Sequence, residues 1–438
     1  IAYHHDFARN WYKLQGINAV GTGASGDTSI SSVLADPVTY AAEYDLAVGT
    51  ISLNDSIVYR ANRRAYYSEG VQSVLNWKTA FAGVDHELTF GARVHQDEED
   101  RFQEEDAYRL QGGQLVLTTA GAAGSQANRV SSGEALALFV QDKFTIGRLS
   151  VTGGARFEDY ELTREDYATS DPTRAAGPDR VRTLSDTVVV PGLSALYEIS
   201  ETTTLLAGVH RGFAIASPGT TNADVEESVN WEFGGRYSRG AFELEAIAYF
   251  NDYSNLLGTC TASSGGGCAV GDQFNGGEVD VQGLEVTAGW DAAAILDTDI
   301  SIPLSVVYTL TDAEFQTSFE SDYEPWGDVV AGDELPYIAD QQLTLSAGLE
   351  ADRWGASLSG NYVSDARARA GQGGVPAREL IEARWVADMA VWVDLTDRIR
   401  VRAKAENLFD EVYVASIDPA GLRPGKPFEF LMGVEVSF

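Results

Sequence analysis

The feature that most constrains this chain is a period-two alternation of apolar and polar side chains that recurs along its length. In residues 428–438 the even positions are apolar throughout, from Phe428 to Phe438, whereas the odd positions include Glu429 and Glu435. The same alternation returns at 229–237, 241–251, 283–290 and 401–406. Successive side chains of a β-strand point to opposite faces, so the pattern predicts strands with one apolar and one polar face.

The connections between these segments alternate between short and long. Short connections fall at 82–85, 145–148, 198–202, 238–240, 350–353 and 394–398, and long ones at roughly 15–63, 99–132, 164–185, 214–224, 256–277, 315–337, 365–379 and 410–427. Transmembrane barrels have short periplasmic turns and long extracellular loops. A soluble β-sandwich or propeller is the alternative, but the full charges on the polar face of strand after strand favour a wet lumen. We predict an all-β fold, an antiparallel transmembrane β-barrel that forms one domain over residues 1–438.

Counting back from the C-terminus gives about 16 strands in a meander, with every neighbouring pair antiparallel. They span roughly 1–14, 64–81, 85–98, 133–144, 148–163, 186–197, 203–213, 225–237, 241–255, 278–290, 299–314, 338–349, 353–364, 380–393, 398–409 and 428–438. The alternation places Trp231, Phe233, Phe242, Phe250, Trp290, Phe428 and Phe430 on the outward face. It places Glu232, Arg236, Glu243, Glu245, Glu285, Arg402, Lys404 and Glu435 on the lumen face.

Composition excludes several functions. The chain carries 31 Lys and Arg against 65 Asp and Glu, a formal net charge of -34. This acidity argues against a nucleic-acid partner, because phosphate contacts need a basic face. No apolar run is long enough for a transmembrane helix. Nucleophile motifs, phosphate loops and zinc-type histidine spacings do not stand out, so we expect no catalytic residues, no metal site and no cofactor, and a protein that is not an enzyme.

Two cysteines, Cys260 and Cys268, lie in one Gly/Ser-rich outer loop. Cysteines in such a loop of an exported protein most often pair, so we predict a disulfide between them.

Several stretches carry a resemblance to a known family. Residues 407–413 (NLFDEVY), followed by the terminal strand 428–438, resemble the end of TonB-dependent outer-membrane receptors, and 211–219 with 226–232 resembles an internal signature of that family. Residues 251–258, 271–277 and 283–285 are similar to its ferric citrate receptor branch. The resemblance covers essentially the whole chain.

The resemblance implies a larger barrel of roughly 22 strands with a plugged lumen. The plug domain and the first strands have no counterpart in this chain, which therefore corresponds to the C-terminal part of the barrel. The function implied is energy-coupled import of a ferric chelate, ferric citrate or a related siderophore, across the outer membrane of a Gram-negative bacterium. The partners implied are the chelate, the inner-membrane TonB complex through the missing N-terminal region, outer-membrane lipids and lipopolysaccharide, and the barrel assembly machinery through Phe438.

An anionic chelate needs local positive charge at the outer mouth, and Arg suits carboxylates because its planar fork forms two hydrogen bonds. The outer loops supply Arg60, Arg63, Arg64, Arg129, Arg367, Arg369 and Arg423, and Gln273 as a neutral donor. The alternative for each Arg is a solvated loop charge balanced by a nearby acid.

Two other functions remain open at this stage. A passive porin of about 16 strands would close on this chain alone, and an adhesion or structural barrel would use long loops without a polar lumen. Closure is the discriminating feature, because an unpaired strand edge in lipid costs several kcal/mol per backbone group. We expect no ladder between residues 1–14 and 428–438, because the resemblance is to a larger barrel whose further strands would pair with both edges.

Overall fold

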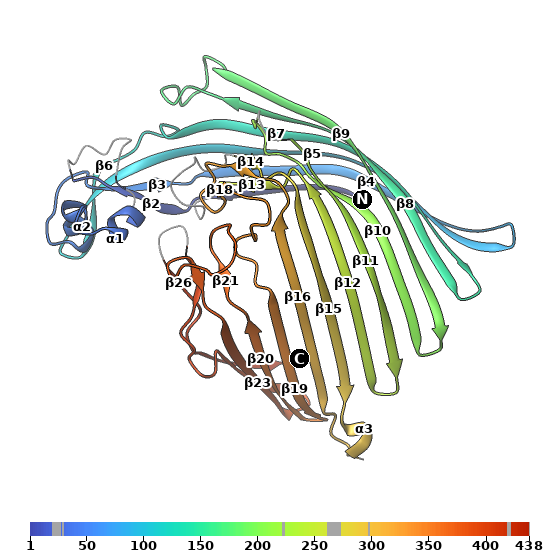
Figure 1. The fold of residues 1–438 in the computed structure, drawn as a ribbon. Helices are drawn as coiled ribbons and strands as arrows, with labels where there is room; N and C mark the ends of the chain where they lie inside the picture. Colours follow the sequence, from blue (N-terminus) through green and yellow to red (C-terminus); the bar gives the residue numbers. More distant parts are fainter. Residues whose placement is uncertain are drawn as a thin grey trace.

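The computed structural model describes residues 1–19, 28, 30–220, 224–260, 273–296, 298–417 and 422–437. Its main feature is a single curved sheet in which each strand pairs antiparallel with the next along the chain (Figure 1). The sixteen strands, in spatial and chain order, are β1 (Ala2–Arg9), β4 (Arg64–Phe81), β5 (Val84–Gln111), β7 (Ala127–Ile146), β8 (Leu149–Asp166), β9 (Arg180–Ser200), β10 (Thr203–Ala214), β11 (Glu226–Arg239), β12 (Phe242–Ser254), β15 (Val279–Asp291), β16 (Pro303–Phe315), β19 (Gln341–Ala351), β20 (Trp354–Val363), β23 (Arg384–Thr396), β24 (Ile399–Glu406) and β27 (Glu429–Val436). The predicted meander is confirmed.

Smaller elements fill the long loops, and one short helix lies at the opposite end. The loop elements are β2 (Tyr12–Ile17), α1 (Ile30–Ala35), α2 (Ala41–Val48), β3 (Ile57–Ala61), β6 (Gln114–Thr119), β13 (Leu257–Thr259), β14 (Gln273–Asn275), β17 (Phe319–Glu320), β18 (Asp328–Val329), β21 (Ala366–Arg367), β22 (Leu380–Ile381), β25 (Val414–Ser416) and β26 (Arg423–Pro424), and the helix at the short turns is α3 (Ala293–Leu296). In Figure 1 the short turns lie along the lower right, and α1 and α2 lie far from them on the left.

The turns explain why one end is compact. At the first short turn Ala82 and Gly83 both have positive φ, 51° and 79°. Two such residues form the type I′ turn, whose twist matches that of the flanking strands. β4 and β5 therefore meet with almost no connecting chain at this end.

The register confirms the predicted faces. Trp231 of β11 lies opposite Phe250 of β12, whereas Arg236 lies opposite Glu245 and forms an ion pair with it. Partners that lie directly opposite share a face. Followed from strand to strand, the register puts the predicted aromatic set on one face and the predicted charged set on the other. Large apolar side chains on the aromatic face stay exposed, such as Phe233 at 62%, as a lipid-facing surface would be.

The sheet does not close on itself within the described residues. β1 pairs with β4 and β27 pairs with β24, and no ladder joins β1 to β27. This agrees with the expectation of an open sheet and disagrees with a sixteen-stranded barrel closed by residues 1–14 and 428–438. Among the described residues, no helix has the length and apolar character to cross a membrane.

Several strands differ in extent from the prediction. The segment predicted as one strand over 1–14 is divided between β1 and β2, with a break at Asn10 and Trp11. β5 continues to Gln111, well past the predicted end at 98, and pairs there with β3 and β6. Much of the predicted loop 99–132 is therefore an extended sheet that rises above the apolar band.

The ends of β15 and β16 and the loop 316–340 share a small core, which we call the loop core: Val279, Phe315, Trp326 and Val329. The rings of Phe315 and Trp326 meet edge to face, with centroids 5.8 Å apart. Trp326 also covers Gly258 and would collide with a Cβ there. The hairpin β13–β14 and the loop 316–340 are thus packed together as a folded layer.

Candidate functional site

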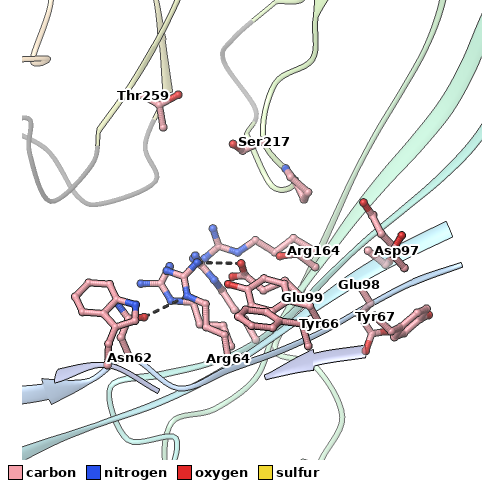
Figure 2. A pocket seen from close by; sticks show the side chains of 18 of the residues that line it. Asn62, Arg64, Tyr66, Tyr67, Asp97, Glu98, Glu99, Arg164, Ser217 and Thr259 are labelled. Atoms are coloured by element: carbon pink, nitrogen blue, oxygen red, sulfur yellow. Dashed lines mark hydrogen bonds and ion pairs between the residues drawn. The ribbon is translucent and has the colours of Figure 1, made fainter. Parts of the chain in front are cut away.

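A cavity of about 660 Å³ lies on the lumen face where β4, β5, β7 and β8 rise above the apolar band. Figure 2 shows Arg64 and Arg164 reaching into the same space, with Ser217 and Thr259 across from them on loops. We call its cationic side the basic wall, which consists of Lys13, Arg60, Arg64, Arg101, Arg129 and Arg164. The remaining lining includes the aromatic side chains of Phe7, Trp11 and Tyr66, and the acids Asp97 and Glu99.

The strand register assembles the basic wall. Arg64 of β4 lies opposite Arg101 of β5, and Arg101 lies opposite Arg129 of β7. Arg164 of β8 lies one pair further along the same face, opposite Ser131. Opposed residues have Cβ atoms about 4.5–5.5 Å apart. Four adjacent strands therefore hold their guanidinium groups together, although their residues are far apart in sequence.

Some cations of the wall have acidic partners. Arg60 Nη2 lies 2.5 Å from Glu105 Oε1, and Arg64 Nη1 lies 2.9 Å from Glu99 Oε2. Arg164 shares Asp166 with Arg182 of β9, at 2.6 and 2.5 Å. Charge-assisted hydrogen bonds of this kind fix the orientation of a guanidinium plane.

Arg101 and Arg129 differ from these. Arg101 is 7% exposed, and in the described part of the chain neither side chain forms a hydrogen bond or an ion pair. Burial, together with neighbouring arginines, lowers the pKa of Arg101 to about 9 and that of Arg129 to about 10. Burial and Arg60 also lower the pKa of Lys13. Both arginines remain charged at neutral pH, so the cavity holds two cations that form no direct ion pair within the described residues.

The loops close the other side of the cavity. Ser217 and Pro218 line it from the segment after β10, and Thr259 and Cys260 line it from the end of β13 and the residue that follows. Gln273 of β14 holds these segments together, because its Oε1 accepts hydrogen bonds from Ser217 N and Thr220 Oγ1 while its Nε2 donates to Thr259 Oγ1 at 3.1 Å. Gln273, predicted as a ligand donor, thus supports lining residues without lining the cavity itself.

The structure brings together Arg60, Arg64 and Arg129 from the predicted set, and separates the rest from the cavity. Arg63 pairs with Glu104 at 2.7 Å. Arg367 is 5% exposed, pairs with Glu334 and donates to the carbonyl of Gly373. Arg369 pairs with Glu324, and Arg423 is exposed in β26. Arg367 and Arg369 belong to the loop layer around the loop core.

Sequence reasoning did not select Lys13, Arg101 or Arg164. Arg101 and Arg164 lie just past the predicted ends of their strands, where the alternation fades. Continuing the alternation of each strand past its predicted end places both residues on the lumen face. Cys268 lies outside the described residues, so the disulfide with Cys260 stays a prediction.

A meander of long antiparallel strands with one apolar and one charged face is the architecture of a transmembrane β-barrel. The family model described as TonB dependent receptor-like, beta-barrel, matches residues 1–408. The chain therefore belongs to the β-barrel family of TonB-dependent receptors.

Solved structures agree in fold. The unliganded ferric citrate transporter FecA aligns with a TM-score of 0.68 and 20% identity over 87% of this chain and 56% of its own. The ferric-catecholate import receptor Fiu from K12 E. coli, in its closed form, aligns at 0.64 and 17% over 88% and 57%. The pyoverdine outer membrane receptor FpvA from Pseudomonas aeruginosa PAO1, bound to pyoverdine, aligns at 0.63 and 13% over 88% and 55%. The chain spans just over half the length of each.

Proposed function

We propose that this chain forms the ligand-binding wall of a bacterial outer-membrane receptor that imports a ferric chelate by energy-coupled uptake. Its cargo is ferric citrate or a related anionic siderophore complex. Membership of the TonB-dependent receptor family supports the transport class. The names of similar proteins, a ferric citrate transporter and a ferric-catecholate import receptor, support an iron chelate as cargo.

The observation that carries the proposal is a pair of cations that form no direct ion pair: Arg101, which is buried, and Arg129, which is half-buried. Burying an unpaired charge is unfavourable, and a bound anion would offset that cost. The guanidinium group matches a carboxylate in geometry and can donate two parallel hydrogen bonds to it. A cavity with several such groups suits a chelate whose surface carries several carboxylate oxygens.

The remaining residues of the wall orient the ligand. Arg60, Arg64 and Arg164 are held by their acids and leave further N–H groups available to the cavity. Because the site is partly removed from water, each charge acts more strongly there than in bulk solvent. These residues bind and position; chemical conversion of the ligand plays no part in the proposed activity.

The partners follow from the same proposal. Energy would come from the inner-membrane TonB complex, the outward apolar band would contact outer-membrane lipids and lipopolysaccharide, and the barrel assembly machinery would insert the sheet. Phe438, the residue predicted to be recognised by that machinery, lies outside the described residues.

A double substitution, Arg101→Gln with Arg129→Gln, tests the site in the complete receptor. Hydrogen bonds to charged groups contribute about 1.5–3 kcal/mol each, so we expect binding of ferric citrate to weaken by about a hundredfold or more. Isothermal titration calorimetry in detergent measures it. Arg378→Gln is the matched control, because Arg378 is an exposed outer-loop arginine paired with its neighbour Glu379. Equal affinity of the double variant and the wild type would contradict the proposed site.

A growth assay tests transport itself. Cells that depend on this receptor should grow on ferric citrate as sole iron source, and growth should be lost when TonB is deleted. Growth that persists without TonB would favour the passive porin.

A further inference from the structure

One carboxylate of the cavity, that of Glu99, is shared among several arginines. Glu99 lies on β5, two residues from Arg101 on the same face, and its neighbours across the sheet are Tyr66 and Ser131. Its Oε2 lies 2.9 Å from Arg64 Nη1. Its negative charge also raises the pKa of Arg101 and of Arg129, which opposes the effect of burial.

The other acids near the basic wall have different neighbours. Glu105 pairs with Arg60, and Asp166 pairs with Arg164 and Arg182. Asp97 lies further down β5, where its carboxylate is 3.6 Å from His95 Nε2. Glu98 has the opposite parity on β5, so its side chain leaves the sheet on the other face. Asp166 lies directly opposite Arg129 in the register, but its two oxygens are paired with Arg164 and Arg182. Glu99 is the acid nearest in register to Arg101.

We propose that Glu99 is a specificity-determining residue: it serves as a resident counter-ion for the empty site and restricts binding to anions that carry several negative charges. This inference rests on the proposed function of the cavity as an anion site.

The physical reason is a competition between carboxylates. An anion with one carboxylate offers the arginines no more charge than Glu99 already supplies, and it must also approach the negative charge of Glu99. At about 6 Å and an effective dielectric constant near 20, two like charges repel by about 3 kcal/mol before screening. An anion with two or three carboxylates can reach Arg101 and Arg129 at the same time and offset that repulsion. Glu99 therefore lowers the affinity of the cavity for every anion, and only anions with several negative charges still bind.

The test uses Glu99→Gln in the complete receptor, with the same shape and one negative charge fewer. Calorimetric titration with ferric citrate measures affinity, and competition by lactate, which carries one carboxylate, measures selectivity. We expect E99Q to bind ferric citrate about tenfold more tightly and to admit lactate as a competitor, because the repulsion is removed. Glu245→Gln is the control: it removes the same charge from an Arg–Glu pair on the lumen face of β12, away from the cavity.

A second measurement does not need a ligand. Without Glu99 the arginines of the empty site repel one another, so the melting temperature of the empty protein should fall more in E99Q than in E245Q. If the wild type binds no ferric citrate, the proposed function fails, and the melting comparison still decides whether Glu99 is the counter-ion. A wild type that binds, with E99Q unchanged in affinity, lactate competition and melting, overturns only the inference about Glu99.

Discussion

Arg101 and Arg129 are the residues whose surroundings are least favourable in the empty protein. The guanidinium group of each lies in a partly desolvated part of the cavity, and in the described part of the chain no acid forms an ion pair with either one. Such residues cost stability, since the interior solvates a lone cation poorly. Their presence is understandable if the cost is offset only when an anion binds.

This trade between stability and binding gives a prediction for Arg101→Met, which keeps much of the side-chain volume and removes the charge. Replacing buried charged groups by apolar ones is often neutral or stabilising, by about 1–4 kcal/mol, so we expect the empty variant to be at least as stable as the wild type while its affinity for ferric citrate falls. Urea unfolding followed by circular dichroism measures the free energy of unfolding. Arg64→Met is the control, because it breaks the direct ion pair between Arg64 and Glu99 and should destabilise the protein. A markedly destabilised R101M would show that the arginine is structural.

Among the elements, the strands that span the apolar band could be predicted closely and the strand extensions above it could not. β4 was predicted with its observed bounds, Arg64–Phe81, because one face is apolar there. In the part of β5 from Glu98 to Asp106 both faces meet water or polar loops, so acids occupy successive positions and the period-two signal vanishes. The candidate site lies mainly on such extensions. Arg64 and Arg129 lie at or close to the start of a predicted strand, so the sequence indicates them as candidate ligand residues. Arg101 lies within an extension that the sequence does not predict.

The loop core shows that the long loops also have their own folding energy. Trp326 is 6% exposed and touches residues from the hairpin β13–β14 and from β16. We predict that Trp326→Ala destabilises this layer by about 3–5 kcal/mol while the strands stay intact. Limited proteolysis should then cut within 316–340 much faster than in the wild type. Val330→Ala, at an exposed neighbouring position, should be cut at the wild-type rate, and equal rates for both variants would show that the loop core contributes little.

At the scale of the whole molecule, the sheet has an apolar outward face and a polar lumen face, and successive residues of each strand alternate between them. Leu345 of β19 is on the aromatic, outward face, and the adjacent Ser346 is on the lumen face, opposite Ser305 and Ser359. The fold class, the meander and these faces all followed from the sequence, because the alternation is set by burial in lipid on one side only.

A pair of substitutions in β19 tests that separation. An arginine on the lipid face of a barrel costs about 2–4 kcal/mol at the bilayer midplane, whereas lumen positions tolerate charge. We therefore expect Leu345→Arg to lower the free energy of unfolding in lipid vesicles far more than Ser346→Arg. The reverse order would mean that the faces are assigned the wrong way round.

The meander also bears on how the chain reaches this state. Every ladder between its sixteen strands joins strands that follow one another in sequence, so the entropy lost in closing each loop is small and grows only slowly with loop length. Hairpins can then form one after another, each using the free edge left by the one before. The backbone N–H and C=O groups at a sheet edge find no water in the hydrocarbon of the membrane. A partly assembled sheet is therefore unfavourable there until the next hairpin forms hydrogen bonds with that edge. The kinetics of insertion are thus expected to follow the order of the chain, with the slowest step at whichever hairpin carries the longest connecting loop.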